Sequence, residues 1–478
     1  MQKPLNRETA AAANTLPVKV LQFGEGNFLR AFADWMIDVM NEKANFGSAV
    51  QVIQPIAQGM GDAVNKQEGL YHVVLNGIRN GRATEETRLI TCVKGVINPF
   101  THYDEYLKAA ENADLQFILS NTTEAGIVFS ETDNNPNALP ITFPGKLAVF
   151  LYRRYQFFKG AADKGLVIMP CELIEKNGAK LKSAILDYVA LWKLPKEFRD
   201  WFEQHNTFCN TLVDRIVPGF PKETINEIKT RIGFDDNLVV TAEPFHLWVI
   251  EGPELLQQKF PTDKAGLEVK FVKDLTPYRT RKVRILNGAH TSLVPVAYLA
   301  GLRTVRESVD DARIGKYLKE VVFEEIIPTL DLPASELKQF ANDVIERFQN
   351  PFIKHELISI SLNSISKFKV RVLPSLLQYI AIKKSIPHKL LFSLAALIRF
   401  YKGDWRGETI AVNDDATAME SFKEAWKNLP IEKIAGKVLS NVSFWDEDLT
   451  KIAAVEAQVS KYLVEIDKRG IEEVLAEL

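Results

Sequence analysis

The chain of 478 residues is too long for one ordinary hydrophobic core, so two or three domains are expected. Its 59 basic and 61 acidic residues leave a formal net charge of −2, and 46% of all residues are hydrophobic. This composition is typical of a globular protein, and it excludes a general attraction to nucleic acid or to an anionic membrane. An anionic ligand would therefore need a local cluster of basic side chains.

The N-terminus and the cysteines favour a cytoplasmic protein without a metal centre. Residues 1–7 lack the apolar run of a signal peptide, and the longest apolar stretches, such as 390–398, are too short to cross a bilayer. Cys92, Cys171 and Cys209 are widely spaced and odd in number, which fits neither a disulfide framework nor a zinc site. We expect a monomer or a small homo-oligomer.

The first part of the chain alternates strand-like and helix-like segments. Residues 18–23 form a β-rich run, and residues 28–40 repeat apolar side chains at helical spacing. Further buried strands are expected at residues 49–56, 115–120 and 165–170, and a helix at 147–158. This alternation predicts an α/β domain of Rossmann type, in which helices cover both faces of a doubly wound parallel sheet.

After about residue 275 only helical periodicity remains. Helices are expected at residues 282–299, 314–327, 334–348, 390–401 and 453–466. We therefore expect a Rossmann-type NAD-binding domain over residues 1–275 and an all-α C-terminal domain over residues 276–478 that binds the substrate and carries the catalytic residues. No flexible linker separates the two parts, which predicts that they pack closely.

A candidate nucleotide-binding turn, Gly24-Glu25-Gly26-Asn27-Phe28-Leu29-Arg30, follows the first strand. The pyrophosphate of a dinucleotide needs backbone N–H groups, a helix N-terminus and no Cβ in its path. Gly24 would make the tight turn and Gly26 would let the pyrophosphate approach, although Leu29 stands where the usual motif has a third glycine. The alternative is an ordinary turn between a strand and a helix. The cofactor-binding residues expected here are Phe23, Gly24, Gly26, Asn27, Phe28 and Arg30.

Two other positions are candidates for contact with the cofactor. Residues 121–124 follow the strand at 115–120, where a doubly wound sheet holds its ligands, so we expect Asn121, Thr123 and Glu124 to contact the cofactor. Simple helix capping is the alternative. Asp62 is the candidate for the ribose-binding acid after the second strand, but the local sequence does not separate NAD from NADP.

The segment from Lys282 to His290 carries the strongest chemical signal. On an α-helix that advances about 100° per residue, Asn287 lies about 140° from Lys282 and His290 about 80°. One broad face can therefore present an amine, an amide and an imidazole. Oxidation of an alcohol by NAD needs a base for the hydroxyl proton and donors for the developing alkoxide. A basic amphipathic helix with a capping amide is the alternative.

Two motifs point to a known family. The pattern Lys-x-x-x-x-Asn-x-x-His at residues 282–290, with Gly-x-Gly-Asn-Phe-x-Arg at residues 24–30, resembles the polyol-specific long-chain dehydrogenases, the mannitol dehydrogenase family. The resemblance extends from about residue 18 to about residue 402. Its most similar stretches are residues 22–32, 120–127, 170–174, 208–217, 285–291 and 350–355.

The resemblance implies NAD as the cofactor and an active site in the cleft between a Rossmann-type and a helical domain. It also implies that Lys282 is the catalytic general base and works without zinc. Asn287 would then contribute to an oxyanion hole, and His290 would orient the sugar.

The sequence departs from the mannitol-type pattern in two places. Those enzymes carry Cys-Asp-Asn where this chain has Cys171-Glu172-Leu173, so a second oxyanion-hole asparagine is expected at Asn177, unless Asn177-Gly178 is only a turn. They also tend to have an acid three residues before the catalytic lysine, whereas this chain has Arg279. A guanidinium fork suits a carboxylate, which favours an acidic substrate over a neutral polyol.

Other substrate-binding candidates carry an alternative explanation each. Arg371, together with Lys367 and Lys369, could add positive charge from the helical domain, but a solvated basic face would look the same. Asp214 resembles a family motif and could lie by the substrate, although an ion pair with Arg215 explains it equally well.

The sequence therefore predicts an NAD-dependent oxidoreductase that interconverts a keto sugar acid (a uronate) and its hydroxy form (an aldonate). The alternatives within the family are fructuronate reductase and a mannitol-type polyol dehydrogenase. A nucleotide-binding regulator without catalysis is an alternative of another class. The epimer that the enzyme selects is left open, because the contacts that decide it do not form a motif.

Overall fold

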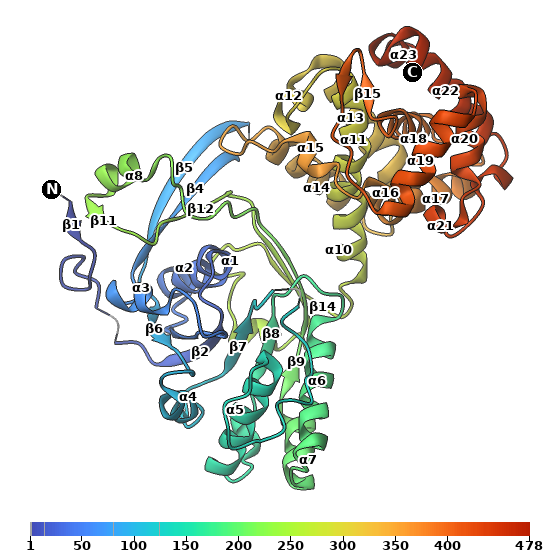
Figure 1. Ribbon diagram of the computed structural model, residues 1–478. Coiled ribbons are helices and arrows are strands. Elements are labelled where there is room, and N and C mark those ends of the chain that lie inside the picture. The colour runs from blue at the N-terminus through green and yellow to red at the C-terminus, as the bar shows by residue number, and fades with distance from the viewer. Residues whose placement is uncertain (1, 14, 80, 124) are drawn as a thin grey trace. The chain divides into compact units, whose positions relative to one another are not determined.

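The computed structural model describes residues 2–13, 15–79, 81–123 and 125–478. The chain divides into two compact units (Figure 1). The first comprises Met1–Gly77 and Thr84–Leu275, and the second comprises Ile78–Ala83 and Thr276–Leu478. The second unit thus includes the last residues of β4 (Tyr71–Arg79) and the first residues of β5 (Arg82–Ile90), while the rest of these strands belongs to the first unit.

A six-stranded parallel sheet forms the centre of the first unit. Its strand order is β6-β3-β2-β7-β8-β9, which is the order of a dinucleotide-binding fold, and the order reverses between β2 and β7. The strands are β2 (Val18–Phe23), β3 (Ala49–Ile53), β6 (Val93–Ile97), β7 (Phe117–Ser120), β8 (Val167–Pro170) and β9 (Thr207–Phe208). The predicted doubly wound sheet is therefore present.

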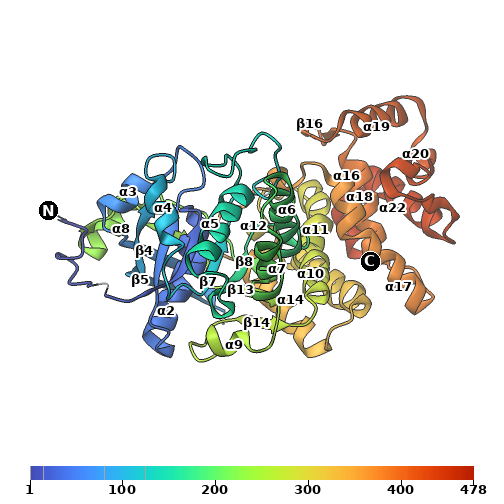
Figure 2. The same ribbon diagram turned by 90° about the horizontal axis from the view of Figure 1, so that it is seen from below.

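Alternate residues of these strands enter two hydrophobic cores, because successive side chains of a strand point to opposite faces. On one face Val52, Leu119 and Met169 pack with α2 (Trp35–Ala44). On the other face Ile118 and Ile168 pack with α4 (Tyr103–Ala109), α5 (Phe143–Phe157), α6 (Asn177–Leu191) and α7 (Lys196–His205). Helices α5 and α6 lie side by side in both views (Figures 1 and 2). Burial on both faces explains why the strands read as continuous apolar runs.

Two three-stranded sheets in the first unit do not correspond to predicted strands. One has the order β12-β4-β5 and consists of β12 (Val240–Ala242), β4 (Tyr71–Arg79) and β5 (Arg82–Ile90). The other has the order β10-β13-β14 and consists of β10 (Asn210–Asp214), β13 (Leu247–Glu251) and β14 (Val269–Val272). All three cysteines, Cys92, Cys171 and Cys209, are buried in this unit.

The second unit is built around one buried helix, α11 (Gly288–Leu299). Eleven of its twelve residues are buried, so neighbouring helices surround it. It contacts α13 (Ala312–Glu320), α16 (Ser364–Arg371) and α18 (His388–Phe400) (Figure 1). The remaining longer helices are α14 (Ala334–Phe348), α17 (Leu373–Lys383), α19 (Ala416–Asn428), α20 (Ile431–Leu439) and α22 (Val455–Arg469).

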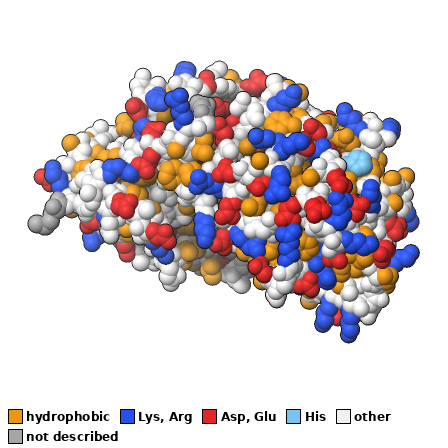
Figure 3. Space-filling view, turned by 90° about the horizontal axis from the view of Figure 1, so that it is seen from above, with side chains coloured by type: hydrophobic (Ala, Val, Ile, Leu, Met, Phe, Trp, Pro, Cys, Tyr) orange, Lys and Arg blue, Asp and Glu red, His pale blue; other side chains and the backbone are white. Residues whose placement is uncertain are grey.

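A short hairpin within residues 276–478 departs from the all-α expectation for this part of the chain. β15 (Asp404–Trp405) and β16 (Glu408–Thr409) form a two-stranded antiparallel hairpin. Its turn residues Arg406 and Gly407 both have positive φ, which suits the tight turn of a two-residue hairpin loop. Such a short hairpin carries too few residues for a periodic signal. No described helix is long and apolar enough to span a bilayer. On the face shown in Figure 3, basic and acidic side chains are interspersed.

Candidate active site

The loop after β2 lies where the strand order of the parallel sheet reverses. Ligands of such sheets bind at this point, outside the carboxyl ends of the strands. Gly24 directly follows Phe23, its φ is +115°, and a Cβ there would lie 3.0 Å from the backbone oxygen of Asn121 at the end of β7. The N–H of Asn121 in turn donates to the oxygen of Phe23 at 3.1 Å. Only glycine fits the turn that brings these two loops together.

The helix that follows this loop offers a cradle for an anion. It runs without a break through α1 (Asn27–Leu29), η1 (Arg30–Asp34) and α2, and Gly26 is its N-cap. No described side chain caps this N-terminus, where backbone N–H groups and the helix dipole attract negative charge. A Cβ on Gly26 would meet no heavy atom within 4 Å, so the space beside it is open. This arrangement fits the pyrophosphate of a dinucleotide.

Four other predicted cofactor residues of this loop contact the protein itself. The guanidinium of Arg30 donates to the backbone oxygens of Glu25 at 3.1 Å and Leu238 at 2.6 Å, and to Asn27 Oδ1 at 2.7 Å. Phe23 is buried, with its ring centroid 4.9 Å from that of Phe143, and Phe28 stacks on Phe32 at the same distance. These side chains shape the loop, while their direct contact with a cofactor stays a prediction.

A buried polar network lies directly beneath the loop. Tyr71 Oη donates to Asp34 Oδ2 at 2.8 Å, and Gln22 Nε2 donates to Asp34 Oδ2 at 3.3 Å and to the oxygen of Gly24 at 3.1 Å. Burial raises the pKa of Asp34 to about 7, against the lowering effects of the hydrogen bonds from Tyr71 and Gln22 and of the nearby Arg30 charge. Gln22 therefore links Asp34, whose pKa is raised, to the backbone oxygen of Gly24 in the glycine turn.

Glu172 ties the loops after β7 and β8 together. It is 2% exposed and accepts hydrogen bonds from Ser120 Oγ at 3.0 Å, Thr122 N at 3.0 Å and Thr122 Oγ1 at 2.9 Å. Burial raises its pKa, and these hydrogen bonds oppose the rise. Asn121 Nδ2 adds a bond to the oxygen of Cys171 at 3.0 Å. In the sequence Glu172 was noted only as a departure from the family pattern. Its role could not be predicted, because its hydrogen-bond partners Ser120 and Thr122 lie about 50 residues earlier in the chain.

Three predicted cofactor residues remain, of which Thr123 and Glu124 follow β7 and Asp62 follows β3. Thr123 has a φ of +80°, an outlier for a β-branched residue, and such strain concentrates at functional sites. Glu124 lies outside the described residues. Asp62 is exposed in the first turn of α3 (Gly61–Lys66).

Asn177 and Asp214, two predicted substrate-site residues, both lie buried in the first unit. Asn177 is 0% exposed; its amide donates to the oxygens of Pro170 at 2.9 Å and Glu172 at 3.0 Å, and it accepts from Thr211 N at 2.8 Å. These contacts join α6 to β8 and β10, which favours the structural alternative over an oxyanion-hole donor. Asp214 ends β10 and is 4% exposed. The catalytic role of Asn177 and the substrate contact of Asp214 stay predictions.

The helix that carries Lys282 is not a regular α-helix. It begins with α10 (Thr276–Arg281), widens into a π-helical turn, η3 (Lys282–Asn287), and continues as α11. The N–H of Gly288 bonds the oxygen of Val283, five residues earlier. In an α-helix residues four apart lie one above the other, whereas here residues five apart take that relation. The α-helical angles expected from the sequence are therefore wrong, because the turn contains one more residue.

The extra residue aligns the predicted catalytic side chains. Asn287 follows Lys282 by five residues and lies one turn above it, and His290 follows Asn287 by three residues. Arg279 precedes Lys282 by three residues, in the α-helical turn before η3. One face of the helix thus presents Arg279, Lys282, Asn287 and His290 in succession, all but His290 being half-buried. This helix and every contact described next belong to the second unit.

His290 lies in an aromatic and basic environment. Its ring stacks on Phe348 with centroids 4.1 Å apart, and the ring of His355 meets it edge-on at 5.0 Å. Its Nε2 is buried and has no hydrogen-bond partner among the described residues. Burial lowers the pKa of His290 well below its ordinary value, and the charges of His355, Arg347, Arg371 and Lys367 lower it further. A neutral imidazole with an unused buried nitrogen can bond a hydroxyl of a ligand.

Three basic residues of α16 divide into two kinds. Lys369 forms an ion pair with Asp446 at 2.5 Å and belongs to the surface. Arg371 and Lys367 lie close enough to His290 to influence its pKa. Burial lowers the pKa of Arg371, and the described residues include no carboxylate in an ion pair with it. The backbone oxygen of Arg371 would lie 3.1 Å from a Cβ on Gly288, so this glycine lets α16 approach the catalytic helix.

Two other arginines near Lys282 contact side chains of neighbouring segments of the second unit. Arg281 is 3% exposed, pairs with Glu336 at 2.8 Å and lies over the ring of Phe340 at 4.3 Å. Arg284 donates to Ser375 Oγ at 2.9 Å, and burial lowers its pKa. Both therefore support the helix from positions off the face that carries Lys282.

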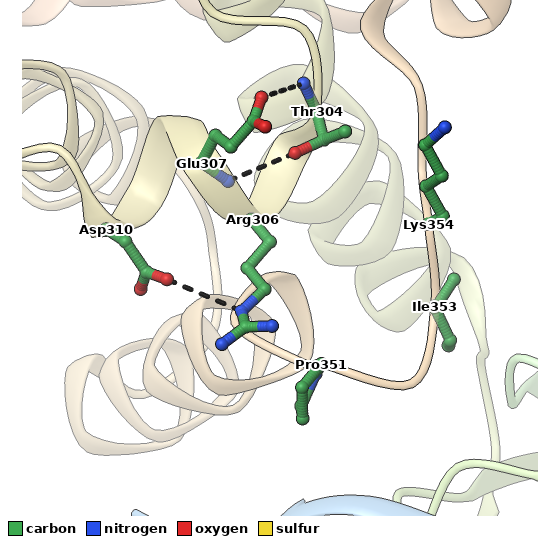
Figure 4. A pocket seen from close by; sticks show the side chains of 7 residues that line it. All are labelled: Thr304, Arg306, Glu307, Asp310, Pro351, Ile353 and Lys354. Atoms are coloured by element: carbon green, nitrogen blue, oxygen red, sulfur yellow. Dashed lines mark hydrogen bonds and ion pairs between the residues drawn. The ribbon is translucent and has the colours of Figure 1, made fainter.

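One pocket of about 420 Å³ lies in the second unit, and Arg279, Lys282, Asn287 and His290 are not among the residues that line it (Figure 4). Arg306 pairs with Asp310 at 3.5 Å within it, and the Thr304 and Glu307 pair caps α12 (Val305–Asp310). Lys354, which also lines the pocket, pairs with Glu356 at 3.1 Å, so the charged groups of the lining already have partners in the protein. No three His, Cys, Asp or Glu side chains of the described residues are grouped as ligands for a metal ion. The pocket is lined by Thr304, Arg306, Glu307, Asp310, Pro351, Ile353 and Lys354.

Two family models cover most of the chain. Residues 18–264 match the mannitol dehydrogenase Rossmann domain, and residues 274–467 match the mannitol dehydrogenase C-terminal domain. Among solved structures, D-sorbitol dehydrogenase in a substrate-free form is similar at a TM-score of 0.83 and 22% identity, over 98% of this chain and 100% of that one. Mannitol 2-dehydrogenase of Pseudomonas fluorescens, in a ternary complex with NAD and D-mannitol, is similar at 0.68 and 21%, over 99% of each chain.

The curated relatives share much more of the sequence. Altronate oxidoreductase of Phocaeicola vulgatus is 48% identical over 99% of both chains, and that of Bacillus subtilis is 46% identical over 99% of this chain and 98% of its own. These relatives and the family models show that the protein is an oxidoreductase that acts on a CH–OH group, and its dinucleotide-type sheet is consistent with this class. The chain belongs to the mannitol dehydrogenase family.

Proposed function

We propose that this protein interconverts D-tagaturonate and D-altronate with NADH and NAD⁺ as the redox pair. The observation that carries the proposal is the face of Lys282, Asn287 and His290, aligned by a π-helical turn and neighboured by Arg371 and Lys367. The names of the relatives at 46–48% identity favour altronate among the sugar acids. We further propose that the enzyme works in the cytoplasm and without a metal ion.

Binding of the cofactor is assigned to the first unit. The open space at Gly26 and the uncapped helix start would hold the pyrophosphate, and the turn at Gly24 keeps Asn121 beside it. The nicotinamide, when bound, gives a hydride to the ketone or takes one from the alcohol. Residues of the chain then have to supply or accept only a proton and to stabilise the charge on the oxygen.

The proton is assigned to Lys282. During reduction its ammonium gives a proton to the oxygen of the former ketone, and during oxidation its neutral amine takes the hydroxyl proton. The amide N–H of Asn287, one turn further along the same face, donates to that oxygen while negative charge develops on it. His290, neutral in this environment, can bond a neighbouring hydroxyl through its buried Nε2 and so orient the sugar.

The carboxylate of the sugar acid is assigned to arginine. Arg371 is half-buried, influences the pKa of His290 and has no ion-pair partner among the described residues. Arg279 lies on the face that carries Lys282. A carboxylate that binds a partly desolvated guanidinium forms charge-assisted hydrogen bonds, which a neutral polyol cannot offer.

The test is NADH oxidation measured side by side with tagaturonate, fructuronate and fructose. We expect the highest kcat/KM for tagaturonate and a much lower value for fructose, which lacks the carboxylate. A higher value for fructuronate would remove the epimer assignment. Equal values for fructose and tagaturonate would show that the arginines do not select an acid.

A further inference from the structure

The usual acid that reads the ribose of NAD is missing from its usual place. In a dinucleotide-binding sheet an Asp or Glu near the end of the second strand bonds the ribose 2′-hydroxyl. Here that strand is β3, and Gln54 follows its last residue, Ile53. The Gln54 amide donates to the oxygens of Ile56 at 2.8 Å and Ala57 at 3.0 Å and accepts from Gly61 N at 3.1 Å. Gln54 therefore folds the loop and is not available to a ribose.

Glu25 of the glycine turn brings a carboxylate to this loop instead. It is 8% exposed, and its Oε1 accepts from Met60 N at 3.1 Å. A Cβ on Gly59 would overlap the same oxygen, so the loop has been shaped to receive this carboxylate. One hydrogen bond leaves most of the acceptor capacity of a carboxylate unused.

The surroundings of Glu25 suit the adenosine half of the cofactor. Residues 54–61 contain neither lysine nor arginine, the residues that would accommodate a 2′-phosphate. Ile56 is 61% exposed and Met60 is 36% exposed, so the loop presents apolar side chains next to a buried carboxylate. An adenine ring needs such an apolar surface, and a ribose needs hydrogen-bond acceptors for its hydroxyls.

We propose that Glu25 reads the adenosine ribose: its carboxylate accepts hydrogen bonds from the ribose hydroxyls and repels a 2′-phosphate, which selects NADH over NADPH. This inference rests on the proposed use of a nicotinamide cofactor and assigns its specificity to the glycine turn. A negative group opposite the phosphate of the wrong cofactor is a repulsive element, and such elements give specificity beyond that of attractive contacts.

The test measures dissociation constants rather than activity. Quenching of tryptophan fluorescence gives Kd for NADH and for NADPH in the wild type, in Glu25→Gln and in Asp62→Asn. Glutamine keeps an oxygen that can accept from Met60 N–H, so the loop should hold while the charge is removed. We expect Glu25→Gln to shift the NADPH-to-NADH ratio of Kd by at least tenfold in favour of NADPH, or about 1.4 kcal/mol. Asp62→Asn tests the acid that the sequence suggested for the ribose; because Asp62 is exposed in the first turn of α3, we expect the ratio to stay unchanged in this variant.

Two results would overturn the proposal while leaving the nicotinamide assignment intact. A ratio that shifts in Asp62→Asn and not in Glu25→Gln would make Asp62 the residue that reads the ribose. Equal weakening of both cofactors in Glu25→Gln would make Glu25 only a support of the loop. If the folded wild type binds neither NADH nor NADPH, the proposed function itself is wrong, and the role of Glu25 is wrong with it.

Discussion

Lys282 is the residue on which the proposed chemistry depends most directly. Replacing it with alanine removes the group that gives or takes the proton, so kcat should fall on the order of 10²–10⁴-fold in both directions. The NADH dissociation constant should stay near the wild-type value, because the cofactor is assigned to residues of the first unit. Lys282→Met retains much of the bulk and should lose activity equally. A Lys282→Ala protein that folds and keeps more than about a tenth of its kcat would exclude lysine as the acid–base group.

Arg371 provides a test of how the enzyme selects an acid. Arg371→Met keeps an unbranched apolar stem like that of arginine and removes the guanidinium charge, so a charge-assisted hydrogen bond worth roughly 1.5–3 kcal/mol is lost. KM for the uronate should rise accordingly, while KM for fructose should change little. Steady-state kinetics with both substrates measure the difference.

Lys369 supplies the matched control for this experiment. It lies two residues away on the same helix, but its ammonium pairs with Asp446. Lys369→Met removes an equal charge and should leave both KM values near wild type. If it raised KM for the uronate as much as Arg371→Met, the general positive potential of α16, and not a specific contact, would select the acid.

The predictability of single residues depended on whether their role is local. Lys282, Asn287 and His290 were predicted from their spacing along one helix and from the family resemblance, and their roles stay predictions. Arg30 was predicted to contact the cofactor, yet its guanidinium bonds the oxygen of Leu238, 208 residues further along the chain. The contacts of Asn177 likewise reach β10. Neither partner can be inferred from neighbouring residues.

At the scale of elements, the loop between β2 and α1 gives a clean test of the cofactor site. A valine at Gly26 would extend into open space, and Gly26 has an ordinary φ of −68°, so the variant should fold as stably as the wild type. It would, however, place a branched side chain where the pyrophosphate must approach. NADH binding should weaken at least tenfold, or about 1.4 kcal/mol, in a fluorescence titration. Wild-type affinity in a folded Gly26→Val protein would place the cofactor elsewhere.

The network beneath this loop predicts a pH dependence of stability. The folded pKa of Asp34 is raised to about 7, above its ordinary value of 3.8. The folded state therefore holds a proton that the unfolded chain releases at lower pH, and the stabilisation is complete below pH 3.8 and lost as the pH rises through about 7. Asp34→Asn keeps an acceptor for Tyr71 without titrating. Its Tm should fall less than that of the wild type between pH 6 and pH 8.

Glu325 in the second unit also affects how the stability depends on pH. Burial also raises its pKa to about 7, so it contributes to the same decline in Tm. Only the difference between the wild type and Asp34→Asn therefore reports on Asp34. Identical slopes of Tm against pH in these two proteins would contradict the prediction.

The elements that could be predicted from the sequence are those in which apolar residues recur at the spacing of a helix or form a buried strand. The helix expected at residues 334–348 coincides with α14 (Ala334–Phe348), whose apolar side chains are buried on one face. The strand expected at 49–56 ends at Ile53, because Gln54 bonds the following loop. β5 (Arg82–Ile90) was missed because most of its side chains are exposed, which leaves no apolar alternation. The π-helical turn was missed because it changes hydrogen bonding without changing the helical character of the sequence.

For the whole molecule, the fold class was predictable and is confirmed by the family models and by the strand order of the sheet. Alternation of buried strands and helices, followed by helices alone, is a pattern of chain-wide extent, so errors at single boundaries do not affect it. The assignment of Ile78–Ala83 to the second unit could not be predicted, because it depends on where the tip of a hairpin packs, as in the bond from Gly81 N to Glu346 Oε1 at 2.8 Å.

The three buried cysteines of the first unit make its opening measurable by thiol chemistry. Burial raises the pKa of Cys92 and Cys171 well above the ordinary value and that of Cys209 to about 12, so the reactive thiolate is scarce in the native protein. We expect no reaction with a disulfide reagent at neutral pH in the native state and three reactive thiols per chain after denaturation.

NADH at about 100 times its Kd should slow the labelling of these thiols about 100-fold when the opening of the protein is in fast equilibrium. The sugar acid alone, assigned to the second unit, should protect the thiols less. Labelling at equal rates with and without NADH would contradict the placement of the cofactor in the first unit. Because all three cysteines lie in that unit, the rate of labelling measures whether a ligand stabilises it.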